Sequence, residues 1–437
     1  MTMSVGTSFK FSGRLDALED DARKALFDRA GSSDAAVSAI VREIISRVRA
    51  DGDKALVDLA RELDRVELKA VEVDNAAIDE ARASLSPELE KALLRAARNI
   101  ERVHAASLPP GVDLEVEEGV FVSRRADPLR RIGIYAPGGT AAYASSVLMA
   151  AIPAKVAGVS EIILCSPPSR ESGLPSSAIL AAARIAGVDR VFAVGGAGAI
   201  AAMAIGTEGI PRVDKIVGPG NAFVAEAKVQ LTSEVGIDCP AGPSELLVIA
   251  DGTATPEIIA REVMAQAEHD ERAVVVVLAV GATIGERIEG AILDALESQP
   301  RQAIIAKSLV ETGGVLIVDN IDEAIDAATA FAPEHLLIAT ENASSVAARV
   351  RCAGSIFIGE SSSVAFGDYM TGANHVLPTS GSARMYSGLS TLDFIRWTTT
   401  EFVTREGASS LAAATANFAD AEGLPAHAAA ARAWSAT

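Results

Sequence analysis

The sequence predicts an α/β protein with two incomplete Rossmann-like parallel-sheet domains, a helical N-terminal segment and a helical C-terminal tail. Apolar runs of strand length alternate with helical patterns over most of the 437 residues, and glycine turns join many of them. Hydrophobic residues make up 49% of the chain but aromatic residues only 4%. Alternating strands and helices are typical of βαβ units in a parallel sheet, and the length suffices for two or three domains.

Helical patterns dominate the N-terminal part of the chain. Apolar positions recur at helical spacing over residues 35–65, with one break at Asp51 and Gly52, and again around residues 86–106. His104 lies among charged residues of the second helix, and we interpret it as a surface residue. Residues 112–128 then read as two short strands joined by a turn.

Two series of strands follow Arg131. The first contains IGIY, EIILCSP and RVFAV, and the second contains SELLVIADG, AVVVVLAVG, GGVLIVD, HLLIAT and GSIFIG. The turns VGPGN and CPAGPSE lie between the series, which favours two sheets. We therefore expect an N-terminal helical segment at 1–27, an α/β domain formed by 28–134 with 246–389, a second α/β domain at 135–245, and an alanine-rich helical tail at 390–437.

Charge and cysteine content limit the partners. The formal net charge is −19, which argues against a nucleic acid or an anionic membrane surface as a partner. The first residues contain no apolar stretch of signal-peptide length, and the longest apolar run, AVVVVLAVGA, is too short to cross a bilayer. Three widely spaced cysteines without a CxxC motif indicate a reducing compartment. A soluble cytoplasmic protein is expected.

A glycine loop between a strand and a helix allows two interpretations. The segment from Gly196 to Ala201 matches GxGxxA, and Asp214 follows at about the distance of the acidic residue in dinucleotide-binding sites. The glycines would then admit a pyrophosphate to the helix N-terminus. Equally, a turn of small residues joins a strand to a tightly packed helix. Both interpretations stay open at this point.

Apart from His104, each histidine follows a carboxylate or carboxamide within seven residues in unusual surroundings. Singly, each fits a core or capping residue, but together they favour one shared polar site. The pairs are Gln266 with His269, Glu334 with His335, Asp368 with His375, and Glu422 with His427.

The chemistry of these residue types suits a metal and proton transfer. Thr255 and Pro256 favour a helix start, and on that helix Gln266 falls on the stripe that should be buried. A buried polar group needs a partner, which could be a side chain, a water or a metal. Nitrogen and oxygen ligands without thiolates suit zinc with positions open for substrate. Beside a strand, His335 could take a proton from an alcohol and Glu334 could activate water.

Longer motifs in this order resemble those of the L-histidinol dehydrogenase family, from VREIISRVRADGDKAL to AHAAAAR. The stretches that carry the resemblance are RRIGIYAPGGTAAYASSVLMAAIPAKVAG, KIVGPGNAFVAEAK, DCPAGPSELLVIAD, QAEH, APEHL, GDYMTGANHVLPT and GLSTLDF.

The resemblance implies a reaction and a set of cofactors. L-histidinol would be oxidised through a bound aldehyde to L-histidine, at the end of histidine biosynthesis. Two NAD molecules would be used in turn, and each subunit would hold one zinc ion. His335 would be the base, and Glu334 would activate the water. In this family the C-terminal tail crosses to the second subunit of a homodimer. Glu422 and His427, which lie in the tail, would therefore complete the site of the neighbouring subunit.

Each role falls on a position of this sequence that matches the family's motifs. The implied zinc ligands are Gln266, His269, Asp368 and His427. The implied substrate contacts are these four together with His335, Ser244, His375 and Glu422. The implied NAD contacts are Tyr135, Asn221 and the position of Gly198, where the family usually has a glutamine. By the same resemblance, the domain with 246–389 carries the metal and catalytic residues, and 135–245 forms the NAD side.

Three other functions are weaker alternatives. A related dehydrogenase for another small alcohol, such as a sulfonated diol, would change residues around the substrate's nitrogens, whereas Ser244, His375 and Glu422 all match. A zinc hydrolase would leave the loops of Tyr135 and Asn221 without a role, and NAD dependence discriminates it. A non-catalytic metal-binding protein would bind zinc and histidinol without forming NADH.

Overall fold

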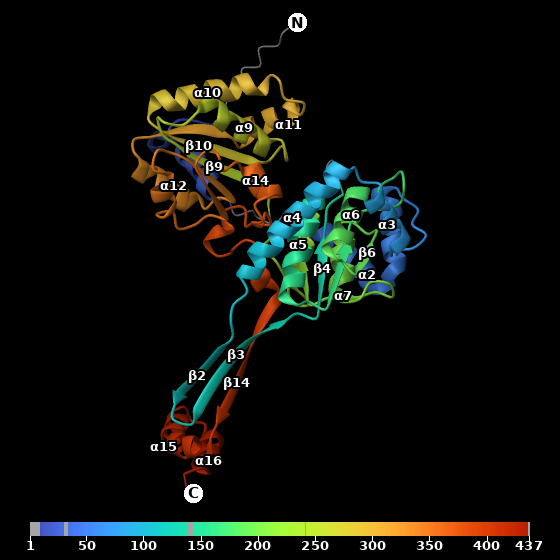
Figure 1. Cartoon of the computed structure of the whole chain (residues 1–437), viewed down its shortest axis with the longest axis vertical. Helices are drawn as coiled ribbons and strands as arrows, with labels where there is room; N and C mark the ends of the chain where they lie inside the picture. Colours follow the sequence, from blue (N-terminus) through green and yellow to red (C-terminus); the bar gives the residue numbers. More distant parts are fainter. Residues whose placement is uncertain (1–8, 30–33, 139–142, 241, 436–437) are drawn as a thin grey trace.

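The computed structural model describes residues 9–29, 34–138, 143–240 and 242–435. Two α/β lobes lie next to each other, and a narrow ribbon of strands leads from them to a small pair of helices near the C-terminus (Figure 1). We call these parts the six-stranded lobe, the five-stranded lobe and the tail. Within the described ranges, no helix is long and apolar enough to cross a membrane.

The six-stranded lobe is built on a fully parallel sheet with the order β1-β11-β10-β9-β12-β13. Its strands are β1 Phe11–Arg14, β9 Glu245–Ala250, β10 Val274–Val280, β11 Gly314–Val318, β12 His335–Ala339 and β13 Ser355–Ile358. On one face pack α9 Pro256–Ala267, α10 Ala282–Leu296, α11 Gln302–Glu311 and α14 Val364–Tyr369. On the other face pack α1 Asp20–Phe27, α12 Ile321–Phe331 and α13 Ala343–Ala347. Coverage on both faces explains the continuous apolar strands.

The five-stranded lobe has a second parallel sheet with the order β6-β5-β4-β7-β8. Its strands are β4 Arg131–Tyr135, β5 Glu161–Cys165, β6 Arg190–Phe192, β7 Lys215–Val217 and β8 Gly236–Ile237. One face carries α3 Asn75–Ala83, α4 Pro87–Ala106, α5 Ala144–Ala157 and α6 Ser177–Ala186. The other carries α2 Ala35–Leu59, α7 Gly196–Ile205 and α8 Ala222–Gln230. The expected division into two sheets is confirmed at the turn CPAGPSE, which lies between β8 and β9, whereas the turn VGPGN lies within the five-stranded lobe.

The helices before residue 107 belong to a different lobe from the one expected. Residues 28–134 were expected to fold with 246–389, but α2 packs on α7 and α8, and α4 packs on α5, all in the five-stranded lobe. The apolar stripes of α2 and α4 fit either sheet equally well by pattern, so only tertiary packing decides between them. The break expected in α2 is confirmed, because Gly52 has a φ of 54° between two helical runs.

The tail differs from an all-helical appendage. β2 Val112–Glu117, β3 Val120–Pro128 and β14 Ile395–Val403 form an antiparallel sheet with the order β14-β3-β2. The strand β14 was missed, although its sequence IRWTTTEFV is rich in β-branched and aromatic residues. The helices α15 Arg405–Ala421 and α16 Pro425–Arg432 follow and pack together through a few alanines. The ribbon holds them away from both lobes (Figure 1).

Short elements complete the chain. The N-terminal segment contains the expected helix α1 but also β1, which extends the larger sheet at its edge. Residues 60–64 form a π-helical turn at the end of α2. Short 3-10 turns are η1 Leu15–Ala17, η3 Ser382–Arg384 and η4 Thr391–Phe394. All three cysteines are free thiols.

Candidate active site

Two predicted catalytic residues lie at the amino end of β12. The helix α12 ends at Phe331, Ala332 adopts a left-handed conformation, and the strand begins at His335. Glu334 and His335 are 5% and 4% exposed. The expectation that both residues lie directly beside a strand is confirmed.

The first residue of β9 holds both side chains through its backbone. The N–H of Glu245 donates to Oε2 of Glu334 at 2.7 Å, and Nδ1 of His335 lies 3.0 Å from the carbonyl oxygen of Glu245. A carbonyl oxygen only accepts, so Nδ1 must carry the hydrogen. Nε2 then has a free lone pair, and no described residue hydrogen bonds to it. This is the state of an imidazole that can take a proton.

Burial controls the protonation of this pair. It raises the pKa of Glu334 well above its usual range, against the opposing effect of the Glu245 N–H, and the charges of Glu245 and Asp368 raise it further. Burial lowers the pKa of His335 to about 4, and nearby His375 and His269 add to the lowering. At neutral pH His335 is therefore uncharged. The site holds a neutral imidazole next to a carboxyl group with weakened acidity.

Asp368 and His375 link the two lobes. Asp368 lies in α14, with Oδ1 at 3.7 Å from Nε2 of His335. Its backbone carbonyl accepts from Nδ1 of His375 at 2.9 Å, which leaves Nε2 of His375 3.2 Å from the hydroxyl of Ser146 on α5. Burial raises the pKa of Asp368 to about 7, with a contribution from the charge of Glu262. These contacts place a segment of the six-stranded lobe against the five-stranded lobe.

The helix α9 presents the other two expected groups of the larger lobe. Gln266 is 3% exposed on its buried face, and His269 follows just after the helix and is exposed. The helix starts at Pro256 as expected, but Thr255 does not cap it. Its hydroxyl instead donates to Glu360 at 2.9 Å. Ser244 directly precedes Glu245, and its carbonyl accepts from the N–H of Val274 at 3.0 Å.

The two tail residues lie far from this cluster. Glu422 and His427 are exposed at the end of α15 and in α16, at the opposite end of the molecule from α9 and α14 (Figure 1). In the part of the chain that the structure describes, no group of three or more His, Cys, Asp or Glu side chains is arranged to hold a metal ion. One copy of the chain therefore brings together only part of the predicted site.

The candidate NAD residues gather at the carboxyl edge of the smaller sheet. Tyr135 ends β4, and its buried hydroxyl accepts from the N–H of Gly196 at 3.1 Å. Burial raises the pKa of this hydroxyl to about 12. Asn221 caps α8 by accepting from the N–H groups of Phe223 and Val224 at 3.1 and 3.2 Å. Ligands of open parallel sheets bind at this edge.

One part of the glycine-loop interpretation is corrected, and the surroundings of Gly198 become visible. Asp214 does not face the loop, because its carboxylate accepts from the N–H groups of Arg130 and Arg131 at 3.0 Å, at the amino end of β4. Gly198 lies buried within α7, and a Cβ there would point at Leu59 of α2, 3.1 Å away. A side chain at this position would thus start in contact with α2.

The interpretation of His104 as a surface residue is wrong, because the side chain is buried. It continues the stripe of Leu93, Ala96 and Ile100 on the inner face of α4. No described residue hydrogen bonds to either ring nitrogen. The charged neighbours that suggested exposure occupy the other faces of the same helix.

Sequence reasoning missed Arg29, Ser146 and the role of Glu245. Glu245 is 1% exposed and forms an ion pair with Arg29. A signal was present, because an acidic residue directly before the apolar run LLVIA of a buried strand requires a charged partner. Nothing in the sequence identifies that partner, which lies 216 residues away.

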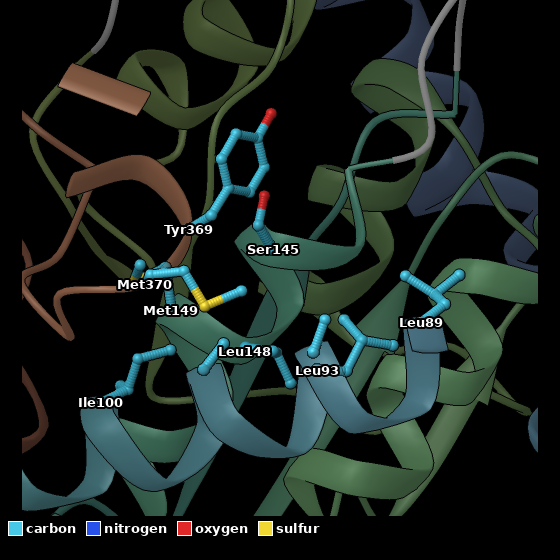
Figure 2. Close-up of a pocket in the computed structure, with 10 residues that line it drawn as sticks. Leu89, Leu93, Ile100, Ser145, Leu148, Met149, Tyr369 and Met370 are labelled. Atoms are coloured by element: carbon cyan, nitrogen blue, oxygen red, sulfur yellow. The ribbon is translucent and has the colours of Figure 1, made fainter. Parts of the chain in front are cut away.

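An apolar groove of about 130 Å³ lies beside the site, between α4, α5 and the end of α14. Figure 2 shows leucine and isoleucine side chains of α4 at its base, with Tyr369 and Ser145 on the opposite side. These two residues are the chain neighbours of Asp368 and Ser146. The groove therefore adjoins the polar cluster. Its lining is Leu89, Ala92, Leu93, Ala96, Ile100, Ser145, Leu148, Met149, Tyr369 and Met370.

Fold and site together define a two-lobed α/β protein with a buried imidazole at the amino end of a parallel strand. Comparisons with known proteins identify the family. The family model for histidinol dehydrogenase matches residues 27–434. A histidinol dehydrogenase from Methanothermobacter thermautotrophicus is 47% identical over 89% of this chain and 91% of its own length. One from Gluconobacter oxydans is 44% identical over 91% and 93%.

A solved structure agrees with the sequence relatives. The crystal structure of histidinol dehydrogenase from Elizabethkingia anophelis matches with a TM-score of 0.92 and 37% identity, over 98% of each chain. This chain belongs to the histidinol dehydrogenase family and is an oxidoreductase. The family resemblance of the sequence and the predicted fold class are thereby confirmed.

Proposed function

We propose that this protein oxidises L-histidinol to L-histidine through bound histidinaldehyde, at the end of histidine biosynthesis in the cytoplasm. The reaction uses two NAD molecules in turn, and each subunit holds one zinc ion. The observation that carries the proposal is the free Nε2 of a buried, neutral His335 with Glu334 beside it. Family membership supports the substrate.

His335 serves as the base in both oxidations. Its Nε2 takes the hydroxyl proton of the alcohol while the hydrogen on the same carbon leaves as hydride. In the second half, Glu334 accepts a proton from the water that attacks the aldehyde carbon, because a carboxyl group whose pKa is raised by burial is a stronger base than an exposed one. NAD, when bound, supplies the hydride acceptor, and zinc would supply a fixed charge that holds the amino and imidazole nitrogens of the substrate.

Gln266, His269 and Asp368 would hold zinc together with His427 of the partner subunit. Imidazole nitrogen and carboxylate or amide oxygen are suitable donors. The exposed position of His427 in the tail leaves it available to a second subunit. Ser244, His375 and Glu422 are the proposed additional substrate contacts, with Glu422 also from the partner subunit.

A homodimer follows from this arrangement. The tail exposes large apolar side chains, which on a separate copy would face water and which favour a protein partner. They include Leu114, Phe402, Phe418 and Trp434. In this proposal residues 246–389 carry the metal and catalytic groups, and the five-stranded lobe binds NAD through Tyr135 and Asn221. At position 198 only the backbone is available to the cofactor.

The test is the yield of NADH per L-histidinol consumed by zinc-replete protein, with and without a chelator. Two NADH per substrate, abolished by chelation and restored by zinc, is the expected result. One NADH with release of aldehyde would contradict the role of Glu334. No NADH at saturating NAD would contradict the substrate, and a sulfonated diol would be tried next.

A further inference from the structure

Glu245 is a carboxylate inside the core, with a side chain that is 1% exposed. Arg29 meets it with two nitrogens, Nε at 3.0 Å from Oε1 and Nη2 at 3.1 Å from Oε2. The N–H of Ser380 donates to Oε1 at 2.9 Å. Both carboxylate oxygens are therefore occupied by donors, which fixes the side chain in one orientation.

Arg29 is itself anchored to two helix ends. It donates to the carbonyl oxygen of Leu26 at 2.7 Å and to that of Phe331 at 2.8 Å. Its guanidinium also lies over the ring of Phe331, 3.3 Å from the centroid. The C-terminal ends of α1 and α12 thus converge on one arginine, and the chain reaches Glu334 three residues after Phe331.

The backbone of Glu245 contacts the two proposed catalytic residues. Its N–H holds Glu334 and its carbonyl holds Nδ1 of His335, as described above. The side chain and the main chain of Glu245 therefore connect Arg29 to the two groups that perform the proposed chemistry. A shift of Glu245 would alter both the orientation of Glu334 and the tautomer of His335.

We propose that the Arg29–Glu245 ion pair acts as a positioning device, which fixes the amino end of β9 so that its backbone orients Glu334 and keeps the hydrogen of His335 on Nδ1. The proposal deepens the proposed function and rests on it for the roles of Glu334 and His335. Neither Arg29 nor the carboxylate of Glu245 touches substrate in this scheme.

A contribution to folding stability does not by itself explain why the core contains the Arg29–Glu245 ion pair. Replacement of a buried ion pair by apolar residues of similar volume is often neutral or stabilising, whereas removal of one partner leaves an unpaired buried charge. The surroundings here are apolar, since Leu26, Leu247 and Phe331 share one core cluster. An apolar pair would therefore suit the core, but it would release the amino end of β9.

The test compares Arg29→Met, Glu245→Leu and the double variant with native zinc-replete protein. Each single variant is expected to melt at lower temperature. The double variant should recover most of the native melting temperature, yet its kcat should stay lower by about tenfold or more, with the KM for NAD unchanged, because a misplaced catalytic group slows the reaction step. Native kcat in a double variant of native stability would overturn the proposal.

Two further measurements keep the outcome decisive. If the double variant fails to fold, Arg29→Lys keeps the charge but loses the two-pronged contact. It should lower kcat without changing KM, and native kcat would overturn the proposal. Arg14→Met is the control, since it removes an exposed arginine pair with Asp16 and Asp319 from the same sheet.

A readout independent of turnover separates this inference from the proposed function. Nitrogen-15 NMR of the histidine rings reports which nitrogen of His335 carries the hydrogen. The native protein should show Nδ1–H, and the double variant or Arg29→Lys should show a mixed or reversed tautomer. An unchanged His335 spectrum would overturn the positioning role even if the enzyme proves inactive on histidinol.

Discussion

At the scale of single residues, hydrogen bonds decide what each imidazole can do. His335 and His375 both use Nδ1 to donate to a backbone carbonyl, and both have a pKa of about 4 because they are buried. Each keeps Nε2 as an acceptor at neutral pH. The resemblance to a family suggested their roles, but only the partners of Nδ1 explain which nitrogen is available.

The Glu334→Gln variant should separate the two oxidations. The amide oxygen still accepts from the Glu245 N–H, so the strand end keeps its geometry, but the variant has no base for water. We expect the first NADH at near-native rate and the second oxidation slowed by about 10²- to 10⁴-fold. Stopped-flow absorbance of NADH, with trapping of the released aldehyde, checks this.

Glu360→Gln is the matched control for that experiment. Glu360 also accepts a backbone N–H, that of Thr255, in the same lobe. It lies at the other end of α9 from Gln266 and should leave both oxidations intact. Equal loss in the two variants would assign the effect to the lobe rather than to Glu334.

His104 gives a prediction for pH dependence. Burial holds its pKa below the usual value, so below about pH 6.5 the unfolded chain binds a proton there that the folded protein does not. The folded state therefore loses stability as the pH falls from the unfolded pKa toward the lower folded pKa. His104→Leu should lose less stability between about pH 7 and pH 5 than the native protein.

Urea unfolding of both proteins at the two pH values measures that difference. Other buried histidines contribute to the same trend, so the comparison concerns the difference between the proteins. If both lose the same free energy of unfolding, His104 is not protonated on unfolding in this range, and its burial has no consequence for pH stability.

At the scale of elements, a turn after β7 connects the candidate NAD residues. Gly218 has a φ of 111°, and its N–H donates to Asp238 at 2.7 Å. Lys228 of α8 pairs with the same carboxylate at 2.6 Å and donates to the carbonyl of Gly218. A buried ion pair thus holds the turn that leads to Asn221 and contacts β4 at Tyr135.

Gly218→Ala should disturb this turn strongly. A Cβ would lie 2.1 Å from the carbonyl oxygen of Tyr135, so the turn must move in addition to bearing an unfavourable φ. We expect a loss of about 3 kcal/mol or more in the free energy of unfolding and a higher KM for NAD. Urea unfolding and steady-state kinetics with varied NAD measure the two effects.

Gly281→Ala is the control for backbone strain alone. Gly281 has a φ of 101°, but a Cβ there would meet nothing within 4 Å. The expected cost is about 1–3 kcal/mol, with KM for NAD unchanged. Similar losses in both variants would show that the contact with Tyr135 is unimportant.

At the scale of the whole molecule, the position of the tail determines whether a single chain can assemble all the proposed site residues. The ribbon of β2, β3 and β14 places α15 and α16 away from both lobes, with their apolar residues exposed (Figure 1). A single copy leaves Glu422 and His427 far from Asp368. Exposed apolar side chains of this kind favour a protein partner, which agrees with the proposed homodimer.

A mixing experiment tests whether sites are shared. His335→Asn and His427→Asn should each be inactive alone. After unfolding and refolding together in equal amounts, mixed dimers would hold one site with both native histidines, so about a quarter of native activity should return. No recovery would show that His335 and His427 act within one chain. Each variant refolded alone serves as the control.

Much of the site could be predicted from local sequence. The strand HLLIAT, the helix that begins at Pro256 and the two sheets all follow from periodicity and turn residues, and long motifs indicated the family. The motifs also named Glu334 and His335, which the structure places side by side and buried. Prediction failed for His104 and β14, where packing and strand pairing override the local pattern of charge or helix propensity.

The sequence by itself determined the elements and the kinds of chemistry available, because backbone propensity and side-chain type are properties of neighbouring residues. Only the tertiary structure decided that α2 and α4 cover the smaller sheet and that Arg29 reaches Glu245 across 216 residues. It also decided that no described residue hydrogen bonds to Nε2 of His335. The physical reason is that a buried charge or imidazole takes its properties from whichever groups surround it. Those groups come from distant parts of the chain, and apolar stripes of similar shape do not encode which of them will meet.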